Sequence, residues 1–151
     1  METAEIIKEI RNKNQLSQGD FSEILCVTRQ AVSRWETGKT TPNYETLKTI
    51  SEKFNVTINT LLGSPKSLIC QCCGMYLQSD DVVSKELDNH FNEDYCKWCY
   101  VDGEYQYKTL EEMLDFLVPL LVEERQQAPE VVRQQLESFL PTLKQWKNKE
   151  A

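Results

Sequence analysis

Two pairs of cysteines are the side chains of this sequence best suited to chemistry. Cys70 and Cys73 form one CxxC motif, and Cys96 and Cys99 form a second one after 22 intervening residues. Each pair can chelate from a tight turn, so four thiolates can surround one tetrahedral Zn²⁺. Four protein ligands leave no open coordination position, and the spacing therefore predicts one structural zinc ion per chain.

The ligand set has alternatives, because one further cysteine and one histidine lie near these motifs. Cys72 could pair with Cys70, but Cys73 would then be unmatched, and the two symmetric pairs give the better geometry. His90, the single histidine, could replace one sulfur. Cys26 and Cys72 are expected to behave as small hydrophobic side chains, with redox sensing as the alternative.

The length and composition allow two small domains. The chain has 151 residues, of which 40% are hydrophobic and 27% charged, and its formal net charge is -7. The first residues, METAEIIKEI, do not resemble an export signal, and no run is apolar enough to span a membrane. We therefore expect a cytoplasmic protein with no membrane partner, in a reducing compartment where CxxC pairs hold metal rather than form disulfides.

The acidic residues are concentrated in the second part of the chain. Residues 1–63 contain eight Lys/Arg and eight Asp/Glu, whereas residues 64–151 contain nine and sixteen, which accounts for the whole net charge. A neutral segment can still bind phosphate if its cations share one face. Gly, Ser and Pro cluster at 63–67, where a linker between two domains is expected.

The first 63 residues show the periodicity of five short helices. Ser17, Thr28, Asn43 and Thr57 are suited to begin helices as N-caps, and Gly38 is placed to end the third helix. A tight turn joins the second helix to the third, which predicts a helix-turn-helix motif.

The third helix is expected to have one apolar and one polar face. Ala31, Val32 and Trp35 fall on one side and are expected to pack inward. The other side carries Arg and Gln, whose donors and acceptors match guanine and adenine edges in the major groove of double-stranded DNA. The predicted base-reading residues are Arg29, Gln30, Ser33 and Arg34, and the predicted phosphate-contacting residues are Gln18, Lys39, Thr41 and Asn43. Thr28, at the start of the same helix, is also a predicted DNA-binding residue.

Residues 4–63 resemble the five-helix DNA-binding domain of the Cro/C1 repressor (XRE) family. In that family an arginine of the first helix often pairs with the glutamate that closes the recognition helix, which implies that Arg11 pairs with Glu36 and faces a phosphate. Cys26 stands where most members have glycine, and positive φ at a residue with a side chain costs about 1 kcal/mol. The resemblance rests on Gln18, Thr28, Arg29, Gln30, Ser33, Trp35, Glu36, Gly38 and Pro42.

Residues 68–148 resemble a zinc-ribbon family of bacterial proteins, some of which carry a repressor-type head. The resemblance implies a metal site and a fold rather than a role. Cys72 stands where a small polar residue is usual in the family. The shared pattern here comprises Cys70, Cys73, Gly74, Met75, Cys96, Cys99 and Tyr100.

Two helical stretches are expected after the ribbon. Thr109 and Glu112 form a capping box that opens the first, Pro119 is expected to kink or break it, and Pro141 interrupts the second. Their apolar stripes could cover the small ribbon or form a dimer contact. The stripes comprise Leu110, Met113, Leu114, Leu117 and Leu121, then Val132, Leu136, Phe139, Leu140, Leu143 and Trp146.

These observations predict a mainly α chain. We expect a five-helix repressor-type DNA-binding domain at 1–63, a linker at 64–67, a zinc ribbon at 68–108, and carboxyl-terminal helices at 109–151 that pack on the ribbon or form a dimer contact. The predicted function is a sequence-specific transcriptional regulator of bacterial type that binds double-stranded DNA as a homodimer, with repression favoured. An enzyme is not expected, because no nucleophile, base and oxyanion donor assemble and the zinc is saturated.

Two other functions remain open at this stage. The chain could be an autoregulating antitoxin-like or adaptor protein whose zinc-ribbon half binds a protein partner. It could also be a zinc or redox sensor.

Overall fold

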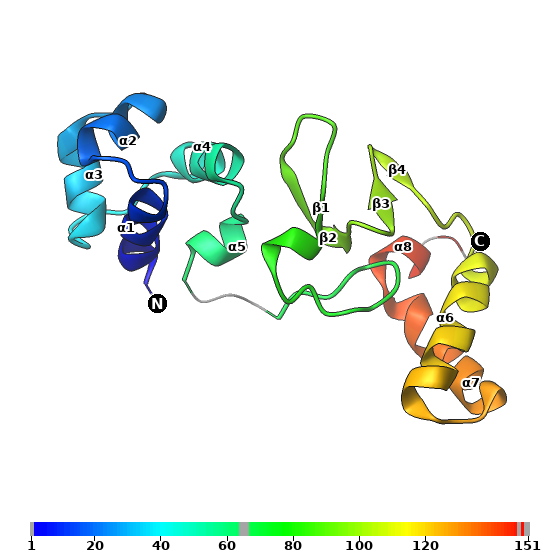
Figure 1. Ribbon diagram of the computed structural model, residues 1–151. Helices are drawn as coiled ribbons and strands as arrows, with labels where there is room; N and C mark the ends of the chain where they lie inside the picture. Colours follow the sequence, from blue (N-terminus) through cyan, green and yellow to red (C-terminus); the bar gives the residue numbers. More distant parts are fainter. Residues whose placement is uncertain (1, 64–66, 148, 150–151) are drawn as a thin grey trace. The chain divides into compact units, whose positions relative to one another are not determined.

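The fold is seen in a computed structural model that describes residues 2–63, 67–147 and 149 (Figure 1). The chain divides into two compact units, one of residues 1–66 with 89–91 and the other of residues 67–88 with 92–151. Of the predicted linker 64–67, residues 64–66 lie outside the described residues. The structure is mainly α, and no helix in the described part of the chain could cross a membrane.

The first unit is built from short helices, and all but the first of them begin at the predicted caps. The helices are α1 (Thr3–Lys13), α2 (Gln18–Ile24), α3 (Arg29–Glu36), α4 (Tyr44–Phe54) and α5 (Ile58–Leu61). The side chains of Ser17, Thr28, Asn43 and Thr57 each accept a hydrogen bond from a backbone N–H three residues later. These bonds satisfy donors that a helix start leaves free, which confirms the predicted starts.

One apolar core holds these helices. Ile7, Phe21, Val32, Ile50 and Leu61 are completely buried, and they come from all five helices. Because α3 contributes Val32 and the nearly buried Trp35 to this core, its opposite face points to solvent.

The turn between α2 and α3 has a residue of positive φ at Cys26, as the resemblance to the repressor family implied. Cys26 has a φ of 54° and is exposed. A cysteine in this left-handed region costs about 1 kcal/mol relative to glycine. The turn nevertheless closes normally, since the backbone N–H of Val27 donates to the carbonyl of Ser22 at 3.0 Å.

The second unit contains a ribbon of short strands followed by helices. Strand β1 (Val83–Lys85) follows a short 3-10 turn, η1 (Asp80–Val82), and pairs with β2 (Phe91–Cys96). Strand β3 (Tyr100–Val101) pairs antiparallel with β4 (Glu104–Tyr105), so that Tyr100 is opposite Tyr105. The helices are α6 (Leu110–Arg125), α7 (Pro129–Phe139), the 3-10 turn η2 (Leu140–Thr142) and α8 (Lys144–Lys147).

The carboxyl-terminal helices share one core with the ribbon. Met113, Val132, Leu140 and Trp146 are almost completely buried in a cluster that also contains Cys70. The predicted apolar stripes therefore pack against the ribbon within this unit. Phe139 departs from the prediction, because it is 40% exposed.

The expected break at Pro119 is wrong. Helix α6 is continuous from Leu110 to Arg125 with Pro119 inside it. Proline at this position removes the N–H that would bond the carbonyl of Asp115. Pro119 lies on the exposed side of α6, where water can take up the freed carbonyl, and the helix continues. The interruption at Pro141 is confirmed, since Pro141 lies in η2 between α7 and α8.

Candidate metal centre and candidate nucleic-acid interface

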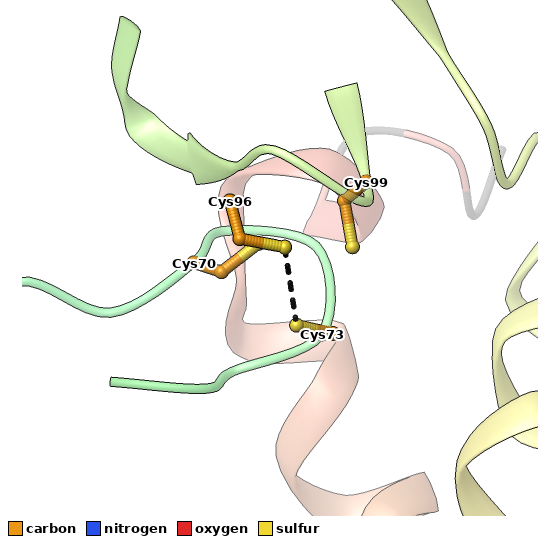
Figure 2. A group of neighbouring side chains, drawn as sticks. All are labelled: Cys70, Cys73, Cys96 and Cys99. Carbon is orange, nitrogen blue, oxygen red and sulfur yellow. Dashed lines mark hydrogen bonds between the residues drawn. The ribbon is translucent and has the colours of Figure 1, made fainter. Parts of the chain in front are cut away.

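The two CxxC motifs meet in the second unit. Cys70 and Cys73 come from one turn, and Cys96 and Cys99 from the turn between β2 and β3, with all four side chains pointing toward one another (Figure 2). Their sulfur atoms lie within 4.8 Å of one another, and the Sγ atoms of Cys73 and Cys96 are 4.0 Å apart. Sulfurs about 2.3 Å from a tetrahedral Zn²⁺ lie about 3.8 Å apart, so the donor set fits zinc.

Backbone hydrogen bonds shape both cysteine-bearing turns. In the first, the N–H of Gly74 donates to the carbonyl of Cys70 at 2.9 Å, and in the second, the N–H of Cys99 donates to the carbonyl of Cys96 at 3.1 Å. Gly74 has a φ of +79°, and a Cβ at this position would lie 2.4 Å from the ring of Phe139. Glycine is therefore required there by both backbone conformation and packing.

The close approach of the four thiols shifts their pKa values in opposite directions. Hydrogen bonds from Cys73, Cys96 and Cys99 lower the pKa of Cys70. The same network raises the pKa of Cys99, chiefly through hydrogen bonding with Cys70. A cation that bound all four as thiolates would relieve this competition.

Neither alternative ligand joins the four sulfurs. Cys72 is buried with its Sγ 3.7 Å from the Sδ of Met113, where it fills space in the apolar core. His90 lies between β1 and β2 and is not part of the cysteine group. All six cysteines are free thiols.

Helix α8 contacts the turn that carries Cys70 and Cys73. The indole N–H of Trp146 donates to the carbonyl of Cys72 at 2.7 Å in a buried position. The backbone N–H of Gln145 donates to the carbonyl of Gln71 at 3.1 Å. Helical spacing places Trp146 only in an apolar stripe, because nothing in local spacing shows that its N–H meets a residue 74 positions away.

In the first unit, α3 presents the predicted base-reading residues to solvent. Arg29, Gln30 and Arg34 are exposed, and Ser33 is half-buried. Their positions on one helix place a guanidinium, a carboxamide and a hydroxyl on the side away from the core. This surface has the donors and acceptors that a base edge requires.

A largely buried ion pair fixes both ends of the helix-turn-helix. The Nε and Nη2 atoms of Arg11 donate to the two carboxylate oxygens of Glu36 at 2.5 and 3.0 Å, and its Nη1 donates to the carbonyl of Leu16 at 2.8 Å. Gln18, expected at a phosphate, also donates to Glu36, at 3.0 Å. Burial opposes ionisation of Glu36, but the hydrogen bonds from Arg11 and Gln18 outweigh it and lower the pKa of Glu36.

The remaining predicted contacts surround α3. Thr28 and Asn43 use their side chains as N-caps of α3 and α4, which places both at helix amino termini with exposed backbone donors. Lys39 and Thr41 are exposed in the segment between these helices. None of these positions is buried, and all are accessible to a ligand from solvent.

Comparison with known proteins agrees with both halves of the structure. A family described as "Putative zinc ribbon domain" matches residues 69–147, more than half of the chain. The chain belongs to this zinc-ribbon family. A helix-turn-helix family matches residues 7–61, which confirms the resemblance to the XRE-type domain.

Two relatives match shorter stretches. The HTH-type transcriptional activator BcrR of Enterococcus faecalis is 47% identical over 63 residues, which cover 42% of this chain and 31% of the relative. Antitoxin PezA of Streptococcus pneumoniae serotype 4 (strain ATCC BAA-334 / TIGR4) is 34% identical over 62 residues, which cover 41% of this chain and 39% of the relative. The chain thus spans between three and four tenths of the length of these relatives.

Proposed function

We propose that this zinc-ribbon protein is a sequence-specific transcriptional regulator of bacterial type that binds double-stranded DNA. The observation that carries the proposal is α3, which anchors Val32 and Trp35 in the core and presents Arg29 and Gln30 to solvent. A helix anchored in this way can place its polar face in a major groove without rearrangement. The helix-turn-helix family match over residues 7–61 supports the same function.

The proposed boundaries are a DNA-binding domain at 1–63, a linker at 64–67, a ribbon at 68–108 and helices at 109–151. The ribbon binds one structural Zn²⁺ per chain through Cys70, Cys73, Cys96 and Cys99, supported by the four converging sulfurs. A zinc ion with four protein ligands has no open coordination position, so it would supply folding energy but no catalysis. We therefore propose a regulator and not an enzyme. Its proposed location is the cytoplasm.

Base reading and phosphate contact are expected to respond differently to substitution. Arg29→Ala should weaken binding to the preferred site by roughly 1 to 3 kcal/mol and relax the preference at one base pair, since Arg reads a base edge. Lys39→Ala should weaken binding to all sequences alike and reduce the salt slope by about one, since Lys39 meets a phosphate. Fluorescence anisotropy across a salt series, on the preferred site and its single-base variants, measures both quantities.

The opposite pattern would place another face of α3 in the groove. If Lys39→Ala changed base preference and Arg29→Ala changed only the salt slope, the proposed orientation would be wrong. Lys53→Ala on α4 serves as a control that removes one exposed cation without touching α3.

The protein is expected to bind DNA as a homodimer on a pseudo-palindrome. One head contacts few bases, and two heads are needed to compete with the excess of non-specific DNA. The centres of the half-sites should lie about one helical turn, ~34 Å, apart. Light scattering of the free protein and of its complex with the preferred site checks the stoichiometry. A single chain in both measurements contradicts this prediction.

Repression is the mode of regulation that requires no protein-binding surface beyond the DNA-binding domain. A head bound over a promoter excludes other proteins by occupancy alone, whereas an activator also needs a surface that contacts another protein. The relative from Enterococcus faecalis is named an activator. Transcription from a reporter carrying the preferred site, with and without the protein, distinguishes the two modes.

An antitoxin-like or adaptor function is the second candidate, because one relative is named an antitoxin. In that case the zinc-ribbon half would bind a protein partner while the head regulates its own promoter. Recovery of a stoichiometric partner that releases the protein from DNA would favour this candidate over a regulator that acts alone.

A further inference from the structure

Helix α6 has an exposed apolar surface next to the side that it buries. Met113, Leu114 and Leu117 pack into the core of the second unit, whereas Phe116 and Leu120 are each 50% exposed. These two side chains are four residues apart and therefore adjacent on the helix surface. The ring of Phe116 contacts the ring of Tyr107 with centroids 5.4 Å apart, which holds it in a defined position.

Acidic side chains border this surface. Asp115, Glu123 and Glu124 are exposed and lie within one turn of Phe116 or Leu120. Within the described residues none of the three forms an ion pair. The surface formed by Phe116, Leu120 and these three carboxylates is called the α6 face below.

The cations of these two helices are directed elsewhere. Arg133 of α7 donates to Glu111 at 2.8 Å and to Glu137 at 2.9 Å. Arg125, at the end of α6, donates to the carboxamide of Gln135 on α7 at 2.9 Å. The negative charge of the α6 face is therefore not compensated by either arginine.

Pro119 adds a hydrogen-bond acceptor to the same face. It lies between Phe116 and Leu120 in sequence and is exposed. Because proline has no N–H, the carbonyl of Asp115 has no donor from the following turn of the helix. An outside donor can bond to this carbonyl beside the carboxylate of the same residue.

We propose that the α6 face binds a positively charged amphipathic segment of another protein. Apolar side chains of that segment would pack on Phe116 and Leu120, and its Lys or Arg side chains would meet Asp115, Glu123 and Glu124. A second copy of this chain is disfavoured, because it would bring two acidic faces together in a protein of net charge -7. Nucleic acid and anionic lipid are disfavoured for the same electrostatic reason.

The test uses the full-length, zinc-loaded protein and three labelled peptides of about five helical turns. The first peptide has leucines on one face and lysines on the other, the second replaces the lysines by glutamates, and the third replaces the leucines by serines. The first peptide is expected to bind in a fluorescence anisotropy titration and to slow hydrogen exchange in α6. The other two are expected to bind at least ~10-fold more weakly, since binding needs both kinds of contact.

Two double variants test the location of binding. Phe116→Ser with Leu120→Ser, and Glu123→Lys with Glu124→Lys, are each expected to raise the Kd of the first peptide at least ~10-fold. The controls Val131→Ser and Glu130→Lys remove an exposed apolar side chain and reverse an exposed charge on α7. The controls are expected to change the Kd less than ~2-fold, as substitutions outside the binding surface.

The proposal is overturned if the Phe116→Ser/Leu120→Ser variant binds the peptide as the unaltered protein does, or if the α7 controls weaken binding equally. It is also overturned if light scattering shows a dimer that this variant dissociates, because the face would then belong to a second copy. Zinc content should be unchanged in both double variants, and DNA affinity should be unchanged in Phe116→Ser/Leu120→Ser, which leaves the charge of the chain as it is. Failure of this proposal is therefore distinguishable from failure of the proposed DNA-binding function.

Discussion

Cys96→Ser is expected to abolish zinc binding and to unfold the second unit. Structural zinc contributes roughly 10 to 16 kcal/mol to the folding of small zinc-binding peptides at pH 7, more than a small domain can lose. The sulfur of Cys96 lies in the core cluster that also contains Met113 and Trp146, so losing the metal disrupts the packing of the helices. Elemental analysis measures the zinc, and hydrogen exchange measures the folding of each unit.

The first unit should remain folded in this variant, since its core consists of other residues. Cys72→Ala is the matched control, because Cys72 is as buried as Cys96 in the same core cluster but does not belong to the group of four converging sulfurs. We expect this control to keep its zinc and lose only packing energy. A full complement of zinc in Cys96→Ser would show that another side chain supplies the fourth ligand.

Glu36→Gln is expected to lower the free energy of unfolding of the first unit by about 3 to 5 kcal/mol, the cost of leaving a buried partner charge unpaired. The side chains of Glu36 and Arg11 are only 4% and 13% exposed. The substitution removes the charge that Arg11 and Gln18 both contact. Hydrogen exchange of the slowest amides in α1 and α3 measures the change in the intact protein.

The pH dependence of stability provides a second readout of the same pair. Because the fold lowers the pKa of Glu36, its contribution is present above the ordinary value of 4.5 and is lost as the pH falls through the lowered value. Glu36→Gln should therefore flatten this acid dependence. Glu45→Gln is the control, since Glu45 is 80% exposed and 3.9 Å from Lys48, and its loss should cost less than about 1 kcal/mol. Equal effects of the two substitutions would contradict the role of the buried pair.

The helix starts and the cysteine group could be predicted from the sequence because local chemistry determines them. A side-chain oxygen at Ser17, Thr28 or Thr109 bonds a backbone N–H three residues away, and such bonds depend only on adjacent residues. The two CxxC motifs likewise carry their geometry in short turns. The confirmed helix starts and the family matches follow from features of this local kind.

Contacts between residues far apart in the sequence could not be predicted in the same way. Spacing along the chain does not show that Trp146 bonds Cys72, or that Gln18 turns to Glu36 rather than toward solvent. Pro119 was expected to kink or break α6, but its exposed position lets the helix continue without a break. Phe139 follows the periodicity of a core residue, yet it lies near the surface, where its ring covers Gly74.

The central claim is that the outward face of α3 reads a DNA sequence, and selection from random double-stranded DNA by the full-length, zinc-loaded protein tests it most directly. We predict enrichment of a single motif whose half-sites are related by two-fold symmetry and centred about one helical turn, ~34 Å, apart. Arg29→Ala, run in parallel, should lose the preference at one base pair of each half-site. A pool that stays random under selection, or a motif unchanged by Arg29→Ala, would contradict the claim.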